Sequence, residues 1–278
     1  MTFESSGRST LQSPKTASPD PNHSQSLERG LAILSTFRSD RPLLGVSELG
    51  RELGLNRSTA HRYVATLARL GYLQQDSASR KYRLGPRVLD LGFSAINSME
   101  LRTVAAPHLQ QLSDDTGYTV NMAILDGTDI VYVERCRSSR PGQREIDLNL
   151  HVGARLPAYC TSMGKVLLAH LPSADLEELL DGADLRPRGP NTLTSRGALL
   201  AELESVRAEG FAINNQELAY GLRSIAAPVL TESGDAAAAI NLAVHSSMTS
   251  IEDLVATLGS HLRRTAAHIS RHLGYRPA

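Results

Sequence analysis

Hydrophobic residues recur at helical spacing three times between residues 26 and 71. The first stripe follows Ser26, a suitable N-cap, and consists of Leu27, Leu31, Leu34 and Phe37. Ser47 is placed to cap a short second helix over Glu48–Leu53, which Gly54 ends because glycine readily adopts a positive φ. A third helix is predicted over Arg57–Leu70, with apolar residues on one side and polar residues on the others. The pattern therefore predicts a small three-helix unit.

A two-stranded hairpin and a further helix are expected next. Tyr72 and Leu73 are separated from Tyr82 and Leu84 by the polar turn QQDSASRK, a pattern typical of a hairpin with an exposed basic tip. Pro86 can occupy the first turn of a helix whose apolar positions are Val88, Leu89, Leu91, Gly92 and Ala95. This helix, over residues 86–98, is expected to link two domains.

From residue 99 the pattern alternates between helical and strand-like runs. Helices are predicted over Leu101–Gly117, Thr161–Leu171, Ala174–Leu180, Gly197–Glu209 and Ser250–His272. Strands are predicted over Tyr118–Leu125, Ile130–Arg135, Glu145–His151, Phe211–Asn214, Ser224–Thr231 and Ala236–His245. The first two strands flank Asp126-Gly127, which favours a hairpin. We expect an α+β domain with an antiparallel sheet.

Length and composition support a division into two folded units. A chain of 278 residues that is 41% hydrophobic can form two cores. Residues 1–25 are rich in Ser, Thr and Pro and nearly free of large apolar side chains, which predicts a disordered tail. The expected organisation is the tail over 1–25, the helical unit with its hairpin over 26–85, the linker helix over 86–98 and the larger domain over 99–278.

Nothing in the sequence directs the chain to a membrane. It contains no run of about 18 apolar residues, and its first residues lack the apolar core of a secretion signal. Cys136 and Cys160 are the only cysteines and do not form a CxxC pair, which favours free thiols in a reducing compartment. We therefore expect a cytoplasmic protein.

Charge is divided unevenly along the chain, although the formal net charge is zero. Residues 27–87 contain 11 Lys or Arg against five Asp or Glu, a net charge of +6, and residues 88–278 carry −6. A basic module attached to an acidic one suits a protein whose smaller domain meets a polyanion, because phosphate contacts drive affinity and acidic surface opposes misplaced docking.

The basic module has the spacing of a helix-turn-helix. In VSELGRELGLNRSTAHRYVATL, residues 46–67, a short helix, a glycine-containing turn and a polar-faced helix follow one another. This spacing lets the second helix present its first turns to base edges in a major groove, while hydroxyl and basic groups hold phosphates. The DNA-contacting residues expected on the two helices and on the hairpin, or wing, are Ser47, Arg57, Ser58, Thr59, His61, Arg62, Arg80 and Lys81.

The motifs SLERGLAILSTF, VSELGRELGLNRSTAHRYVATLARLGYL and KYRLGPRVLDLG resemble the N-terminal domain of the IclR family of bacterial regulators. The runs LNLHVGARLPAYCTSMGKVLLAHL and FAINNQELAYGLRSIAAPV are similar to that family's effector domain, so the resemblance covers about residues 26–275. The run RLPAYCTSMGKVLL resembles the branch that controls aromatic-acid catabolism through the β-ketoadipate route. The resemblance implies a winged helix-turn-helix, a linker helix and a GAF-like effector domain.

The same resemblance implies an effector pocket. Its matching positions here are Ser162, Met163, Asn214, Ser224, Asn241 and Ala243. Met163 and Ala243 stand where many relatives have small polar residues, so a ligand with a ring or alkyl body is favoured. Candidates to meet a carboxylate or ring hydroxyl are Arg155, Tyr159, Arg223 and His245, although each could equally be a surface or interface residue.

Three patterns point towards an enzyme, and each has a simpler interpretation. Ser162-Met-Gly-Lys165 fits S-x-x-K but lacks the S-D-N and K-T-G motifs of serine acyl-enzymes. His261, His268 and His272 could share a helix face as zinc ligands, but no H-E-x-x-H is present and a polar helix face is favoured. Cys160 has no evident activating partner. We expect no catalytic residue, metal or cofactor.

The sequence therefore predicts a DNA-binding transcriptional regulator that forms a homodimer or tetramer and binds a small organic acid. Effector binding would change the spacing of two winged helices through the linker helix, because dimeric helix-turn-helix proteins read half-sites about one helical turn apart. A metal- or thiol-dependent enzyme using the C-terminal domain is the alternative, and a ligand-independent architectural DNA-binding protein is a third possibility.

Overall fold

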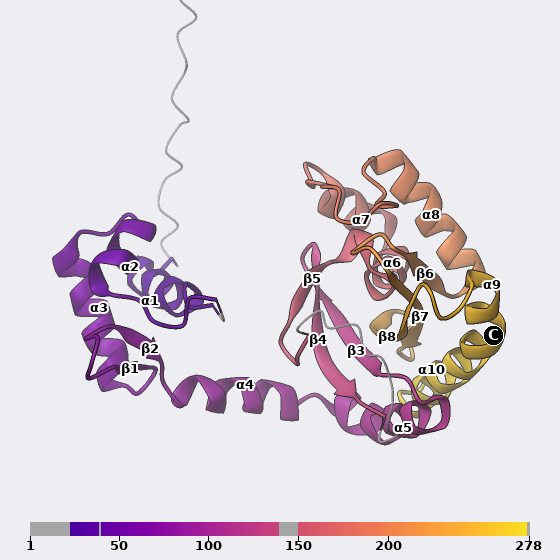
Figure 1. The fold of residues 1–278 in the computed structure, drawn as a ribbon, viewed down its shortest axis with the longest axis horizontal. Helices are drawn as coiled ribbons and strands as arrows, with labels where there is room; N and C mark the ends of the chain where they lie inside the picture. The colour runs from indigo at the N-terminus through magenta and orange to yellow at the C-terminus, as the bar shows by residue number, and fades with distance from the viewer. Residues whose placement is uncertain (1–22, 39, 139–149, 277–278) are drawn as a thin grey trace, which may run out of the picture. The chain divides into compact units, whose positions relative to one another are not determined.

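The computed structural model describes residues 23–38, 40–138 and 150–276. They form two compact units that divide between Ser94 and Ala95, within helix α4 (Arg87–Asn97) (Figure 1). Among these residues no helix is both long and apolar enough to cross a membrane.

The first unit contains three helices and a hairpin. The helices are α1 (Gln25–Ser35), α2 (Val46–Glu52) and α3 (Arg57–Arg69), and the hairpin pairs β1 (Leu73–Gln75) with β2 (Tyr82–Leu84). Its buried core comprises Ile33, Phe37, Leu44, Leu49, Val64, Leu73 and Tyr82. The elements agree with the winged helix-turn-helix that the hydrophobic pattern predicts.

Two helix starts in this unit differ from the sequence prediction. Ser24, not Ser26, caps α1, and its hydroxyl accepts the Leu27 amide. Gly45 stands at the cap of α2 in place of Ser47, because the Glu48 carboxylate reaches back to accept the Gly45 amide at 2.6 Å. A carboxylate at the third position supplies the acceptor, so the cap residue itself needs no side chain.

The apolar stripe of α1 is also only partly core. Ile33 is fully buried, whereas Leu27 and Leu31 are 63% and 54% exposed. Helix α4 is amphipathic in sequence, yet none of its residues is buried. These two helices therefore present apolar side chains that the single chain does not cover.

The second unit is a six-stranded antiparallel sheet between two helical layers (Figure 1). Strand order is β5-β4-β3-β8-β7-β6. The strands are β3 (Val120–Asp126), β4 (Asp129–Cys136), β5 (Arg155–Pro157), β6 (Ala212–Asn215), β7 (Leu222–Leu230) and β8 (Ala236–His245). The α+β class and the antiparallel sheet are confirmed; β5, with only three residues, was too short for the hydrophobic pattern to reveal.

Each face of the sheet has its own core. Helices α5 (Glu100–Thr116) and α10 (Ser260–His272) pack on one face through residues such as Leu109 and Ile269. Helices α6 (Ser162–Ala169), α7 (Ser173–Leu180) and α8 (Arg196–Glu209) cover the other. We call the second side the α6 face.

Two predicted elements differ from the structure. The last helix is not continuous over Ser250–His272: α9 (Ile251–Asp253) is followed by a π-helical segment, Leu254–Gly259, before α10 begins. There Gly259 lies against Ile225, whose Cδ1 would be 3.0 Å from an added Cβ. The predicted strand over Glu145–His151 lies mostly outside the described residues, and Leu150 and His151 are not in a strand.

Candidate DNA interface and effector site

The turn between α2 and α3 sets the direction of α3. The Leu55 amide donates to the Gly50 carbonyl at 2.8 Å, and an added Cβ at Gly50 would approach the Leu55 carbonyl oxygen at 2.9 Å. Gly54 adopts a φ of +64°, which favours glycine. Close packing at this turn fixes α3 against α2, as a helix-turn-helix requires.

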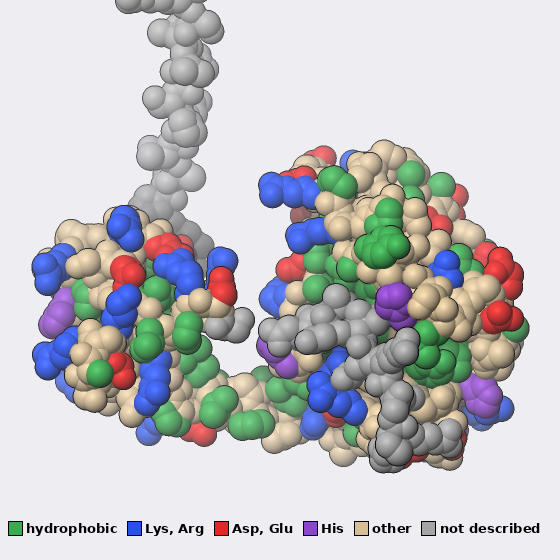
Figure 2. All heavy atoms as spheres, viewed as in Figure 1, with side chains coloured by type: hydrophobic (Ala, Val, Ile, Leu, Met, Phe, Trp, Pro, Cys, Tyr) green, Lys and Arg blue, Asp and Glu red, His purple; other side chains and the backbone are tan. Residues whose placement is uncertain are grey.

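Helix α3 presents a polar face at its first turns. The Asn56 side chain caps it, accepting the Thr59 amide and the Ser58 hydroxyl, each at 2.8 Å. Ala60 and Val64 are buried, whereas the exposed residues on the helix include Arg57, Ser58, His61 and Arg62. Figure 2 shows Lys and Arg side chains over the visible face of this unit. This is the arrangement expected of a recognition helix.

The wing places its basic residues differently. Arg80 is exposed at the tip with a φ of +60°. The Lys81 ammonium lies 3.1 Å from a Glu48 carboxylate oxygen, so this side chain braces the wing against α2. Hydrogen bonding from the Gly45 amide, and then from Lys81, lowers the pKa of Glu48. Exposed Arg83 was not among the expected DNA contacts, and its guanidinium donates to Gln74 across the hairpin.

The polar positions of the predicted pocket meet on the α6 face in two cross-strand rows. Directly paired residues of an antiparallel sheet point to the same face. One row runs from β6 to β8 and contains Asn214, Ser224 and Ala243. The next row runs from β7 to β4 and contains Ala226, Asn241, Asn121 and Arg135. We call these two rows, with Ser162 above them, the polar layer.

Helix α6 closes over this layer at its N-terminus. The Thr161 hydroxyl caps it by accepting the Gly164 amide at 3.0 Å, and the Ser162 and Ser224 hydroxyl oxygens lie 2.7 Å apart. Gly164 is required here because an added Cβ would lie 2.1 Å from the Ala158 carbonyl oxygen. The Ser162 and Met163 amides have no acceptor among the described residues, so this helix end can accept an anionic group.

Hydrogen bonds within the polar layer fix its side chains. The Asn214 amide donates to the Cys160 carbonyl at 2.5 Å. The Asn121 amide donates to Asn241 Oδ1 at 2.8 Å, and the Arg135 guanidinium donates to Asn121 Oδ1 at 2.9 Å. The Asn241 amide nitrogen donates to none of the described residues. Buried, oriented amides of this kind can recognise a polar ligand without reorganising.

Three members of this face were not among the expected pocket residues. Asn121 and Arg135 lie in the second row, and Tyr132 pairs with Ala123, two residues beyond Asn121 on β3. Burial raises the pKa of Tyr132 to about 12, so its hydroxyl stays a hydrogen-bond donor at neutral pH. An asparagine inside the apolar run TVNMAIL was the available signal for a functional face.

Four predicted contacts lie elsewhere. The Arg155 guanidinium is on β5 and pairs with Asp126 at 2.7 Å and Asp129 at 3.3 Å. Arg223 alternates with Ser224 on β7 and therefore points to the opposite face, where it donates to Asn215 and to the Ser246 and Thr249 carbonyls. Half-buried His245 pairs with Leu222 at the end of β8, so it shares the face of Ala243 and Ser224 but lies one row beyond the polar layer, with Nδ1 2.7 Å from the Ser247 hydroxyl.

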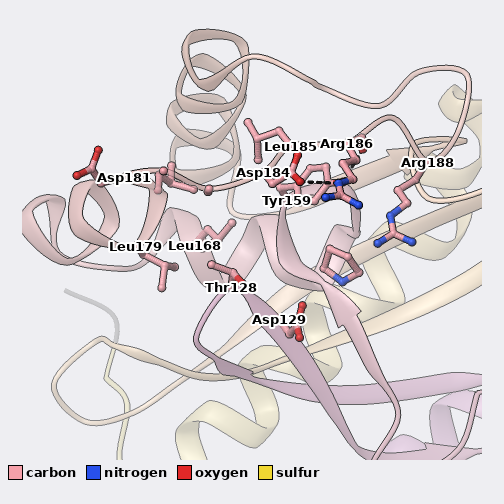
Figure 3. A pocket seen from close by; sticks show the side chains of 14 residues that line it. Thr128, Asp129, Tyr159, Leu168, Leu179, Asp181, Asp184, Leu185, Arg186 and Arg188 are labelled. Carbon is pink, nitrogen blue, oxygen red and sulfur yellow. Dashed lines mark hydrogen bonds and ion pairs between the residues drawn. The ribbon is translucent and has the colours of Figure 1, made fainter. Parts of the chain in front are cut away.

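The fourth, Tyr159, lines a separate pocket of about 480 Å³ (Figure 3). Its hydroxyl donates to the Arg186 carbonyl at 2.5 Å, and burial raises its pKa. Leu168, Leu179 and Arg188 also line this pocket, whereas Ser162, Asn214, Ser224 and Asn241 do not. The structure thus brings together the residues implied by the pocket positions, with His245 in the neighbouring row of the same face, but not Arg155, Arg223 or Tyr159.

The groups considered for catalysis are held in structural roles. Lys165 Nζ lies 2.8 Å from Glu202 and 2.7 Å from Glu217, whereas the Ser162 hydroxyl bonds to Ser224, so the S-x-x-K pair is not assembled. Both cysteines are buried, and burial raises the pKa of Cys160 to about 11. A protonated thiol is a poor nucleophile at neutral pH, so neither observation supports enzyme chemistry.

Comparison with known proteins agrees with this architecture. Residues 26–77 match the IclR helix-turn-helix domain, and residues 93–271 match the bacterial transcriptional regulator IclR C-terminal domain. The chain is 41% identical over 226 residues to the Pca regulon regulatory protein of Pseudomonas putida, covering 81% of this chain and 76% of that protein. It is 34% identical over 243 residues to the p-hydroxybenzoate hydroxylase transcriptional activator of Acinetobacter baylyi, covering 86% of this chain and 88% of that protein.

Two solved structures share the fold. The IclR protein of Thermotoga maritima superposes with a TM-score of 0.70 at 26% identity, covering 91% of this chain and all of the other. An IclR homologue from Microbacterium hydrocarbonoxydans, complexed with 4-hydroxybenzoate, superposes with a TM-score of 0.75 at 29% identity. The match covers 89% of this chain and 98% of the other.

The winged helix-turn-helix and the separate α+β domain with a buried polar layer together define a DNA-binding transcriptional regulator with an effector-binding domain. The chain belongs to the IclR family of bacterial transcriptional regulators. The family resemblance seen in the sequence is confirmed, and the relatives named above include a Pca regulon regulatory protein and a p-hydroxybenzoate hydroxylase transcriptional activator.

Proposed function

We propose that this regulator binds its operator in the bacterial cytoplasm as a homodimer, through α3 and the wing, under the control of an aromatic carboxylic acid bound at the polar layer. The polar layer carries this proposal, because it is a buried set of oriented amides and hydroxyls beneath a helix N-terminus. The first effectors to test are 4-hydroxybenzoate and protocatechuate, and the names of the relatives support that choice.

The chemistry of the α6 face suits an aromatic acid. A carboxylate would be stabilised by the α6 N-terminus and by donors such as Asn241 and Arg135. The ring would pack against Met163, and the Ser162 and Ser224 hydroxyls would donate further hydrogen bonds to the carboxylate. Met163 is fully buried and belongs to the apolar core of this side of the sheet.

Binding and selection experiments test the function directly. Full-length protein would select duplexes from a random-sequence DNA pool, and fluorescence anisotropy would then measure operator affinity with and without 4-hydroxybenzoate. We expect one recurrent sequence and a change in affinity of about fivefold or more with effector, the usual range of allosteric coupling. Selection of no sequence, or affinity indifferent to every aromatic acid, would contradict the proposal.

Replacing Arg62 with alanine should weaken operator binding. Arg62 is exposed on α3, and loss of a bidentate base contact typically costs about 1–3 kcal/mol, or roughly fivefold to 150-fold in affinity. Anisotropy at fixed salt measures the change, while effector binding should be preserved. An operator affinity equal to that of the wild type would remove Arg62 from the interface.

The wing offers a matched control. Arg80→Ala removes an exposed tip cation, so it should weaken operator and unrelated DNA alike and reduce the salt dependence of log K by about one unit. If Arg80→Ala instead changed sequence preference alone, the tip would read bases rather than phosphates.

The uncovered apolar residues of α1 and α4 support dimer formation. Leu27 and Leu31 on α1 are exposed, as are Leu89, Leu91 and Phe93 on α4, at 61%, 57% and 59%. Side chains of this size are normally buried, and pairing of two chains would cover them. A dimer also gives the two recognition helices that a pair of half-sites requires.

The variant Phe93→Glu should therefore weaken self-association by at least about tenfold, since it places a charge in an apolar interface. Sedimentation equilibrium measures the change, and operator affinity should fall with it. Tyr220→Glu is the control, because Tyr220 is also an exposed aromatic residue, at 86%, but belongs to the other unit. The Tyr220→Glu variant should sediment as the wild type does. Equal association of Phe93→Glu and wild type would contradict the interface.

A further inference from the structure

Three imidazole rings meet on the surface formed by α5 and α10. His268 and His272 lie one turn apart on α10, and His108 comes from α5, which packs against it. The ring centroids are 4.5 Å apart for His108 and His268, 4.7 Å for His268 and His272, and 5.4 Å for His108 and His272. Each ring places one nitrogen within 4.8 Å of a nitrogen of the other two.

This spacing is close to that of a metal site. Zinc–imidazole bonds of about 2.0–2.1 Å in a tetrahedral site put ligand nitrogens roughly 3.4 Å apart. Rotating the side chains would close the remaining separation, because His108 and His268 are half-buried and His272 is exposed. The pair on α10 has the i, i+4 spacing with which helices commonly hold one ion.

A backbone contact orients one of the three rings. His272 Nδ1 lies 3.4 Å from the His268 carbonyl oxygen, and Nε2 takes no part in this contact. Backbone contacts of this kind orient imidazole ligands in metal sites.

We propose that His108, His268 and His272 bind one divalent transition-metal ion of the zinc type. Three imidazoles leave a fourth coordination position open to water, and His108 and His268 line a surface depression of about 350 Å³. Imidazole nitrogen is a preferred ligand of Zn²⁺, Ni²⁺ and Cu²⁺ and not of Mg²⁺ or Ca²⁺. The site is separate from the polar layer, since α5 and α10 cover the opposite face of the sheet.

Two arginines limit how tightly the ion is held. Arg264 and Arg271 line the depression, where Arg264 bonds to His261 Nδ1 and Arg271 donates to the Ala267 carbonyl. Their positive charge repels the bound cation and favours an anionic ligand at its open coordination position. Because Arg264 bonds to His261, that histidine is not one of the proposed ligands. The third imidazole is that of His108 on α5.

A bound ion would join two helices that are distant in sequence. His108 and His268 are separated by 160 positions, so coordination should stabilise the folded α5–α10 pair by mass action. Helix α5 begins at Glu100, shortly after α4 ends at Asn97. The ion would therefore stabilise the segment that directly follows the linker helix.

Untagged full-length protein, stripped with a chelator, tests the site. Isothermal titration with Zn²⁺ should give one ion per chain, and Co²⁺ should give the visible absorption of a nitrogen-ligated tetrahedral site. His272→Ala should weaken Zn²⁺ binding by at least tenfold without disturbing the fold, since His272 is exposed. His108→Gln should do the same, and Zn²⁺ should raise the melting temperature of the wild type but not of either variant.

The exposed histidine His151 provides the matched control, and His151→Ala should bind Zn²⁺ as the wild type does. Absence of Zn²⁺ binding by the wild type would overturn the proposal. So would unchanged binding by the double variant His108→Gln/His272→Ala, because the ion would then lie elsewhere, for example at a cysteine. None of these outcomes depends on whether an aromatic acid is the effector.

Discussion

Replacing Lys165 with methionine is expected to destabilise the effector domain by about 3–5 kcal/mol, the usual cost of removing one partner from a buried ion pair. Lys165 is 1% exposed and bridges Glu202 and Glu217. Glu217 is itself nearly buried, and its Oε2 has no hydrogen-bond partner among the described residues. Without the ammonium group, Glu217 would remain as a buried and uncompensated carboxylate. Scanning calorimetry and chemical denaturation measure the loss.

The same substitution at Lys81 is the control. Lys81 also pairs with a glutamate, but its side chain is 42% exposed, so Lys81→Met should change stability by less than about 1 kcal/mol. Adding Glu217→Gln to Lys165→Met should recover part of the stability because it removes the unpaired charge. Equal effects of Lys165→Met and Lys81→Met would show that burial does not govern this ion pair.

The effect of Lys165→Met should depend on pH. Burial raises the pKa of Glu217, and Lys165 opposes that rise, so the variant should have a still higher folded-state pKa. A carboxyl group whose pKa is higher in the folded than in the unfolded state is compatible with folding while it is protonated. It destabilises the fold once it ionises. The difference in unfolding free energy between wild type and variant should therefore narrow as the pH falls towards the unfolded-state pKa of about 4.3. If the difference in unfolding free energy did not change with pH, the unpaired Glu217 carboxylate would not be the cause of the destabilisation.

Replacing Ser224 with leucine should abolish or strongly weaken effector binding. Ser224 is 4% exposed, and its hydroxyl lies 2.7 Å from that of Ser162. The larger side chain would crowd the neighbouring Ser162 and would remove a hydrogen bond, which to a charged group is worth roughly 1.5–3 kcal/mol, or about tenfold or more in affinity. Calorimetric titration with 4-hydroxybenzoate, protocatechuate, glyoxylate and pyruvate measures the loss. Operator binding without effector should survive.

The exposed Ser205 on α8 supplies the control, because Ser205→Leu makes the same change far from the polar layer in sequence and on the surface. It should bind effector as the wild type does. Wild-type affinity in Ser224→Leu would place the pocket elsewhere, with the Tyr159 pocket as the next candidate. Binding of the small keto acids alone would contradict the aromatic-acid assignment without contradicting the pocket.

Local sequence patterns determined the elements of this protein and the class to which it belongs. The spacing of apolar residues predicted α3, the wing and most strands, because helix and strand periodicity reflect which side of an element is buried. The separation of basic and acidic segments predicted a DNA-binding module beside an acidic one. These signals lie within short stretches of chain and do not depend on how distant elements pack.

The tertiary structure alone decided which distant side chains meet. Alternation along β7 and pairing across the sheet placed Ser224 in the polar layer and Arg223 on the opposite face, although the two are adjacent in sequence. The same pairing brought Asn121 and Arg135 to Asn241. Packing of α5 on α10 brought His108 to His268 and His272, whereas the sequence pattern had offered His261 as the third histidine. Register and packing depend on the whole chain, so a local pattern could not contain them.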